Sequence, residues 1–151
     1  MNARDIVHSV YAPETMNSTF VAAFNSRTIN SILHLFAEDA VITVDSARQT
    51  LSGKEMVRFA LGKLLEQADR ISSRETLCMV HGDLALLRAD VDLRLGERVI
   101  STHEMSAVIH RGANGLWRYA GATLPGFEIV PRVARGKAPP TLGAVSRQAR
   151  P

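Results

Sequence analysis

The chain has 151 residues, of which 46% are hydrophobic and 22% are charged, and this ordinary globular composition excludes a disordered, collagen-like or coiled-coil protein. The net charge of +3 comes from the C-terminal end: residues 131–151 hold five basic residues and no acidic one, whereas residues 1–130 hold 13 basic and 15 acidic residues and carry −2. A nucleic-acid-binding face needs clustered cations on a folded surface, so we expect no nucleic-acid partner.

We expect one domain in the middle of the chain, because a chain of this length typically forms a single domain without a disulfide or metal. Residues 1–12 are predicted to form an N-terminal arm and residues 13–130 the domain. Residues 131–151 are predicted to be a flexible basic tail, since they hold four of the six prolines and show no apolar period.

The single cysteine, Cys78, excludes an intramolecular disulfide and a zinc cluster, and its apolar neighbours predict that it packs as a small hydrophobe. No stretch approaches about 18 uninterrupted apolar residues, so we expect no membrane span and no membrane partner. The first residues also lack the apolar stretch of a secretory signal. We therefore expect a protein of the cytoplasm.

The first half of the chain predicts three helices and a strand. Apolar residues recur at helical spacing after Pro13, so residues 13–25 are predicted to form an amphipathic helix, and a shorter helix is predicted from residue 29. The β-branched residues 40–44 predict a strand that ends in a turn. The sequence Ser-Gly-Lys-Glu at residues 52–55 has the pattern of a capping box and predicts a third helix that runs to about residue 67.

The period of the apolar residues then changes from about 3.6 to 2, which is typical of strands. Turns are predicted at Gly82, Gly96 and Gly115, and the last of these follows an asparagine in a strong hairpin signal. The strands between them are predicted over residues 71–80, 87–95, 99–109 and 116–123. The clearest has one apolar face and one charged face, the latter made of Arg88, Asp90, Asp92 and Arg94. Segregated helices and hairpins predict an α+β fold, with three N-terminal helices packed on a curved antiparallel sheet that encloses a pocket.

Four short runs of sequence, in this order, carry a resemblance to a known superfamily. They are Phe-Ala-Glu-Asp-Ala-Val at residues 36–41, Ser-Gly-Lys-Glu at 52–55, Gly-Asp-Leu-Ala at 82–85 and Asn-Gly-Leu-Trp-Arg at 114–118. With them, residues 13–125 resemble the nuclear transport factor 2-like superfamily, which includes ketosteroid isomerase and the SnoaL-like polyketide cyclases. The resemblance implies a cone-shaped, cystatin-like roll with a pocket, and commonly a homodimer packed through the sheet.

The resemblance also implies where an active site would lie. Ketosteroid isomerase has a tyrosine on its first helix, an acid on its penultimate strand and a general-base aspartate near the end of its first strand. The shared runs place these positions on Phe20, Ser106 and Val44, with Asp45 one residue later. Two of the three positions therefore lack the isomerase side chain, and the third is displaced by one residue.

Two acidic residues are candidate catalytic groups. Asp45 follows the predicted strand 40–44 and is a candidate general base, with the alternative that it caps a turn. Glu104 neighbours His103 on a strand, so the two side chains face opposite sides. By the match to Ser106 we expect the even-numbered face, with Thr102, Glu104 and Ser106, to line the pocket. The alternatives are that the face of His103, with Ser101 and Met105, lines it, and that Glu104 has a solvent-exposed or interface role.

Aromatic residues on the last strand and on the helices are the candidate ligand contacts. Trp117, Tyr119 and Thr123 are predicted to share one strand face, with the Tyr119 hydroxyl as a polar group. Their counterparts on the helices are Phe20, Phe24, Met56 and Phe59. The alternative is plain core packing. No histidine pair, phosphate loop or nucleophile motif has the required spacing, so no metal or cofactor is expected.

Three classes of function follow from these observations. The first is a domain that binds an apolar small molecule in the pocket. The second is a cofactor-free acid–base enzyme of the isomerase, cyclase or hydrolase type, acting on an apolar carbonyl or polyketide-like substrate. The third is a dimeric interaction module. A homodimer through the outer sheet face is expected, and a filled pocket would favour the third class.

Overall fold

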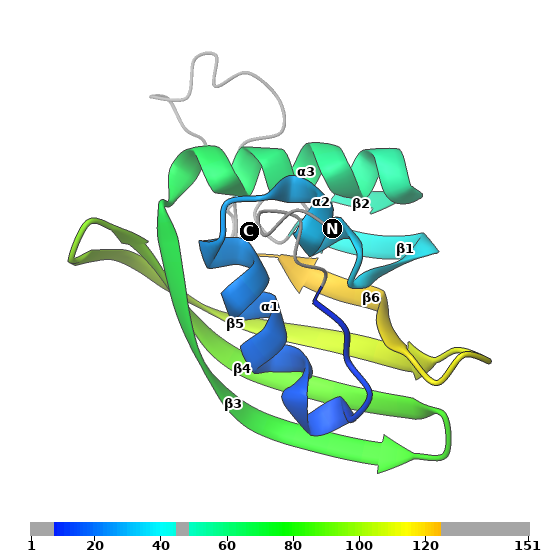
Figure 1. The fold of residues 1–151 in the computed structure, drawn as a ribbon. Coiled ribbons are helices and arrows are strands. Elements are labelled where there is room, and N and C mark those ends of the chain that lie inside the picture. The colour runs from blue at the N-terminus through cyan, green and yellow to red at the C-terminus, as the bar shows by residue number, and fades with distance from the viewer. Residues whose placement is uncertain (1–7, 45–48, 125–151) are drawn as a thin grey trace, which may run out of the picture.

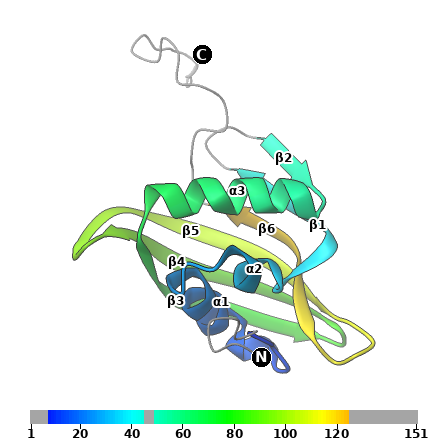
Figure 2. The same cartoon turned by 45° about the horizontal axis from the view of Figure 1, so that its top comes forward.

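The computed structural model describes residues 8–44 and 49–124, which form a curved sheet covered on one face by helices (Figures 1 and 2). In chain order the elements are a 3₁₀ helix (Pro13–Thr15), α1 (Met16–Asn25), α2 (Ile29–Leu33), β1 (Phe36–Val44), β2 (Gln49–Ser52), α3 (Lys54–Gln67), β3 (Arg70–His81), β4 (Leu84–Leu95), β5 (Arg98–Arg111) and β6 (Trp117–Leu124). The predicted α+β class is confirmed. The predicted tail, and the arm up to residue 7, lie outside the described residues.

The sheet is mixed rather than wholly antiparallel. Its strand order is β2-β1-β6-β5-β4-β3, and neighbouring strands are antiparallel except β1 and β6, which are parallel. The prediction of an antiparallel sheet is therefore wrong at this one pair. Parallel neighbours are never joined by a tight turn, so no hairpin signal in the sequence could have announced the pairing of β1 with β6.

The three predicted hairpins are confirmed. Strands β3 to β6 pair in sequence order, and the turns that join them contain Gly82, Gly96 and Gly115. These glycines have φ values of 61°, 61° and 85°, a region in which other residues are strained. The turns therefore form where the glycines allow the chain to reverse.

The two faces of β4 differ as its sequence predicts. The face turned toward the helices, here called the inner face, carries the buried residues Ala85, Leu87, Ala89, Val91 and Leu93. The opposite outer face carries Arg88, Asp90, Asp92 and Arg94. Because side chains alternate along a strand, the register between β4 and its neighbours assigns the residues opposite to the same two faces.

Helix α3 begins at Lys54, and its N-cap is Gly53 at φ 92° without a side-chain hydrogen bond. The predicted capping box is therefore wrong. Ser52 belongs to β2, and Glu55 lies 3.9 Å from Arg58 on the helix surface instead of reaching back. Because the N-cap is Gly53, Ser52 lies one position too early to cap the helix, and a glycine has no side chain to do so.

Side chains at the C-terminal end of α1 form hydrogen bonds to the sheet and to the end of α3. The Asn25 side chain bridges the backbone of Ile71 on β3: its Nδ2 donates to the carbonyl at 3.0 Å, and its Oδ1 accepts from the amide at 2.9 Å. Arg27 Nη1 and Nη2 donate to the carbonyls of Ala68 and Leu65 at 2.6 and 2.5 Å. These carbonyls lie at the C-terminal end of α3, where a helix leaves its acceptors unpaired and favours a cation.

We expect Asn25→Ala to lower the free energy of unfolding by about 1–3 kcal/mol, because a half-buried amide and carbonyl of Ile71 lose their partners. Chemical denaturation of the two proteins measures the loss. Asn30→Ala is the matched control, since the Asn30 amide on the neighbouring α2 is exposed and accepts only from Arg58 at 3.3 Å. Equal stability of the two variants would contradict the role of Asn25.

Candidate functional site

A small cavity lies between α1 and the inner face of strands β3 to β6. Its volume is about 20 Å³, which is room for about one water molecule. The walls are mostly apolar and include Phe20, Leu87, Val91 and Met105. The polar residues of the lining are Asn17, Glu75 and Tyr119, together with Arg88 and Ser106, which the strand register assigns to the outer face.

Phe20 and Tyr119 meet at this cavity, as the sequence predicts. The Phe20 ring approaches Tyr119 edge-on with centroids 5.9 Å apart, and the Phe36 ring packs against Tyr119 in a tilted arrangement with centroids 4.8 Å apart. Tyr119 is buried, and burial, followed by the negative charge of Glu75, raises the pKa of its hydroxyl. The phenol therefore stays protonated and can donate a hydrogen bond.

Glu75 is the carboxylate that sequence reasoning missed. It lies on β3 opposite Ala89 of the inner face and is half-buried. The register of β3 with β4 shifts between Glu75 and Leu77, and such a bulge redirects the side chains that follow it. As a result Cys78, opposite the buried Leu87, also faces inward. The bulge therefore interrupts the alternation of inward-facing and outward-facing residues along β3. For this reason the sequence pattern did not show that Glu75 faces inward.

Asn17 extends the polar side of the cavity from α1 to β3. Its Oδ1 accepts a hydrogen bond from Ser73 Oγ at 3.0 Å. Ser73 lies opposite the buried Val91 and two residues before Glu75 on the same strand. The contact places a side-chain amide beside a carboxylate and a phenol at the edge of an apolar cavity.

The expected even-numbered face of β5 is on the other side of the sheet. Thr102, Glu104 and Ser106 pair in register with Asp92, Asp90 and Arg88, which belong to the outer face. Glu104 Oε2 lies 3.8 Å from Arg88 Nε, and Thr102 Oγ1 donates to Asp92 at 2.7 Å. The expectation that Thr102 and Glu104 line the pocket is wrong, because a bulge near the Gly96 turn shifts the register of β5 by one residue and sets its even-numbered residues opposite the charged face of β4.

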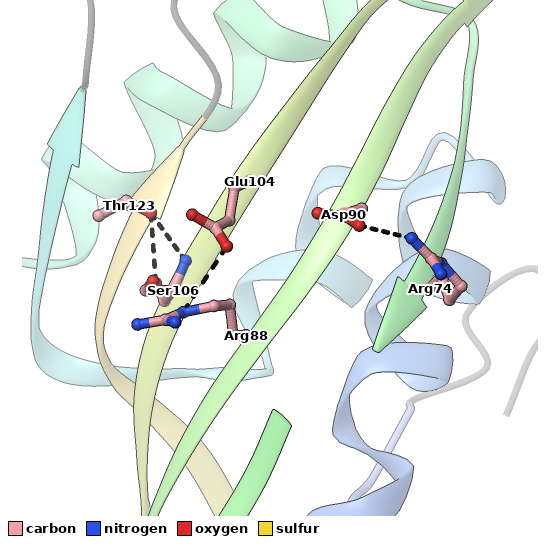
Figure 3. A network of polar contacts seen from close by, with 6 residues as sticks. All are labelled: Arg74, Arg88, Asp90, Glu104, Ser106 and Thr123. Atoms are coloured by element: carbon pink, nitrogen blue, oxygen red, sulfur yellow. Dashed lines mark hydrogen bonds and ion pairs between the residues drawn. The ribbon is translucent and has the colours of Figure 1, made fainter. Parts of the chain in front are cut away.

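Ser106 and Thr123 meet on that outer side (Figure 3). The Ser106 amide donates to Thr123 Oγ1 at 2.9 Å. The predicted grouping of Thr123 with Trp117 and Tyr119 fails because the register of β6 with β5 shifts next to Tyr119 and moves Thr123 to the opposite face. Ser106 is nevertheless among the residues that line the inner cavity.

Met56 and Phe59 do not reach the cavity. They are 39% and 41% exposed, and α3 instead buries Val57, Ala60, Leu61 and Leu64. The prediction was wrong because α3 carries apolar residues on more than one face. The spacing 56, 59, 60, 64 fits a helix as well as 57, 60, 61, 64 does.

Phe24 and Trp117 belong to the core beside the cavity rather than to its walls. Phe24 is buried at the side of Phe20, with ring centroids 6.3 Å apart. Trp117 is buried too, the Arg111 guanidinium lies 5.5 Å from its ring centroid, and its Nε1 has no hydrogen-bond partner among the described residues. For both residues the core-packing alternative holds.

The remaining predictions concern Asp45, the Cys78 thiol and the absence of a metal site. Asp45 lies outside the described residues, so its role as a base stays a prediction. Burial, followed by the charges of Glu75 and Glu14, raises the pKa of the Cys78 thiol, which disfavours the nucleophilic thiolate. Within residues 8–44 and 49–124, no group of three metal-ligating side chains comes together, and no helix is long and apolar enough to cross a membrane.

Comparisons with known proteins agree with this geometry. Residues 18–120 match the SnoaL-like domain family, and no curated protein matches the chain. The structure resembles a ketosteroid isomerase-like protein from Erwinia carotovora atroseptica, with a TM-score of 0.61 and 17% identity over 79% of this chain and 95% of that one. It also resembles a proposed ketosteroid isomerase from Parabacteroides distasonis, with a TM-score of 0.63 and 22% identity over 78% and 89% of the two chains.

A third similar structure is a proposed association domain of the calcium/calmodulin-dependent protein kinase type II kind from Thiobacillus denitrificans. Its TM-score is 0.64 at 19% identity, over 82% of this chain and 100% of that one. At such identities the three likenesses show the fold alone. The family match covers most of the described domain, and the chain therefore belongs to the SnoaL-like domain family, within the nuclear transport factor 2-like superfamily that its sequence motifs predict.

Proposed function

We propose that the domain binds a small apolar molecule that carries one hydroxyl or carbonyl group, in the cavity between α1 and the sheet. The observation that carries the proposal is Glu75, a carboxylate at the wall of a mostly apolar cavity. In the described part of the chain, none of the ion pairs includes Glu75. A half-buried charge without a partner costs folding free energy, so we attribute it to binding.

Glu75 and Tyr119 offer complementary hydrogen bonds to such a ligand. The protonated phenol donates to a carbonyl or hydroxyl oxygen, and the carboxylate accepts from a hydroxyl. The apolar part of the ligand would then contact Phe20, Leu87 and Met105. An apolar pocket with a few convergent polar groups is the usual form of a small-molecule site.

The cavity as it stands has a volume of about 20 Å³, far below the ~300–1,000 Å³ of ligand pockets. A ligand with an aromatic ring needs the volume that the Phe20 ring now fills. Binding therefore requires Phe20 or the α1 helix that carries it to move. The hydrogen bonds of Asn25 and Arg27 hold the C-terminal end of α1, so we expect the opposite end, at Met16 and Asn17, to move further.

Acid–base catalysis would use the same cavity, with Glu75 as the base and Tyr119 as the donor to a carbonyl oxygen. Two of the similar structures are a ketosteroid isomerase-like protein and a proposed ketosteroid isomerase. We place binding first because Glu104 faces away from the cavity, so Glu75 has no second acid beside it there among the described residues.

Titration with 2-naphthol, followed by its fluorescence, tests the proposal, because this probe is an aromatic ring with one hydroxyl. We expect the protein to bind it. Tyr119→Phe and Glu75→Gln keep the shape of each side chain, and each should weaken binding about tenfold, the effect of losing one hydrogen bond to a charged or well-placed partner.

Naphthalene is the matched probe, since it lacks the hydroxyl. Its affinity should be the same for the parent protein and for both variants. The proposal is contradicted if 2-naphthol does not bind, or if Tyr119→Phe and Glu75→Gln bind it as tightly as the parent protein does.

A second function is favoured by the outer sheet face, and we propose that it joins two copies of the chain. Met79, Leu86 and Val108 lie side by side on β3, β4 and β5 and are 59%, 39% and 40% exposed. Neighbouring exposed apolar side chains of this kind mark interaction surfaces. The small volume of the inner cavity also supports an interaction role.

The charges beside this apolar row fit a second copy. Arg74 pairs with Asp90 at 2.7 Å and Arg88 with Glu104 at 3.8 Å on the same face (Figure 3). Because both signs lie close together, a partner related by a two-fold axis can set its acids against these bases. One of the similar structures is a proposed association domain of the calcium/calmodulin-dependent protein kinase type II kind.

Light scattering at micromolar concentration tests the second proposal, and we expect the mass of a dimer. Leu86→Lys should give a monomer, since it puts a charge in the apolar row. Met56→Lys is the matched control: Met56 is 39% exposed like Leu86 but lies on α3, so this variant should remain a dimer. A monomeric parent protein would overturn the proposal.

A further inference from the structure

A larger hollow lies at the other side of β1, apart from the cavity described above. Its volume is about 450 Å³, and its walls come from the residues before and within β1, the start of α3 and the ends of the β5–β6 hairpin. It shares no lining residue with the inner cavity. Its size is within the range of small-molecule sites.

Basic side chains converge on this hollow from four separate segments. They are His34 after α2, Lys54 at the start of α3, His110 on β5 and Arg118 on β6. The carboxylate among the lining residues is Glu38, whose side chain is 87% exposed and lies 3.5 Å from Lys54 Nζ. The walls of the hollow therefore carry more positive than negative charge, with the negative charge out toward the solvent.

The Arg118 side chain is positioned by a backbone carbonyl and not by an ion pair. Its Nε donates to the carbonyl of His34 at 3.1 Å, and no acidic residue of the described chain forms an ion pair with it. The remaining nitrogens of a guanidinium form a planar fork that suits two oxygens of one anion. Lys54 Nζ also donates to a carbonyl, that of Phe36 at 3.2 Å, and it forms an ion pair with the exposed Glu38 at 3.5 Å.

We propose that this hollow binds the phosphate group of a small molecule. Arg118 and Lys54 supply two fixed positive charges, which match the charge of about −1.5 to −2 that a phosphate monoester carries near neutral pH. The imidazoles of His34 and His110 add donors when they are protonated. Leu116 and Phe36 give the hollow an apolar wall for the rest of the molecule.

His34 reports on the local charge. Burial lowers the pKa of its imidazole first, and the positive charges of Arg118, Lys54 and His8 lower it further. Glu38 and His110 are the other titratable groups at the hollow. An anion bound beside Arg118 would neutralise this field and stabilise the imidazolium, so it must raise the pKa of His34.

The test is a titration of the full chain with inorganic phosphate, followed by the NMR signals of the histidine side chains. We expect phosphate to shift the His34 signals and to raise the pKa of this residue, whereas sodium chloride at equal ionic strength should do neither. Arg118→Gln should weaken phosphate binding about tenfold or more. Arg98→Gln is the matched control, since it removes the same charge from an exposed position at the start of β5.

Lys54→Gln provides a second variant in case the loss of Arg118 disturbs the contact with His34. It should weaken phosphate binding while the fold, judged by the backbone NMR spectrum, stays intact. The proposal is overturned if phosphate shifts no histidine NMR signal other than those that sodium chloride also shifts. It is also overturned if Arg118→Gln and Lys54→Gln bind phosphate as well as Arg98→Gln does.

Discussion

Three consecutive backbone carbonyls, just before and at the start of β1, accept hydrogen bonds from residues of both candidate sites, the inner cavity and the outer hollow. The carbonyl of His34 accepts from Arg118 Nε, that of Leu35 from the Tyr119 amide at 2.7 Å, and that of Phe36 from Lys54 Nζ. One short segment therefore places the phenol that lines the inner cavity and the two cations of the outer hollow, and it fixes the parallel pairing of β1 with β6.

This arrangement explains why polar groups persist where they cost stability. The inner face of the sheet is otherwise apolar, so Glu75 and the Tyr119 hydroxyl reduce what hydrophobic burial contributes there. Arg118 and Lys54 likewise lie close enough to His34 to disfavour its protonation. Uncompensated groups of this kind are typical of binding sites. The fold itself is stabilised elsewhere, by the aliphatic face of β4, by α3 and by the side chains of Asn25 and Arg27.

The sequence predicts most of the framework because the patterns involved are local. The alternation along β4 and the glycines at 82, 96 and 115 define the hairpins without any knowledge of the fold. The pairing of β1 with β6 could not be predicted in this way, because it joins segments about eighty residues apart. The face of β5 was misjudged from a family match, because the bulge next to the Gly96 turn shifts its register with β4 by one residue and so exchanges the two faces.

The candidate site was predicted only in part. Phe20 and Tyr119 lie on unambiguous faces and were found, whereas the bulge in β3 concealed Glu75 and a broadly apolar α3 misplaced Met56 and Phe59. Each error concerns which face of an element is buried. A local pattern cannot decide that when apolar residues occur on several faces or the alternation is broken. The basic hollow was missed because its residues come from four segments, none of which has a motif.

The central claim is that the cavity beside Tyr119 is where an apolar ligand binds. Intermolecular nuclear Overhauser effects between 2-naphthol and the isotope-labelled protein test its location directly. The account predicts contacts from the probe to the rings of Phe20 and Tyr119 and to the methyl group of Met105. Contacts confined to the exposed side chains of Met56 and Phe59 on α3, with none to Phe20 or Tyr119, would contradict it.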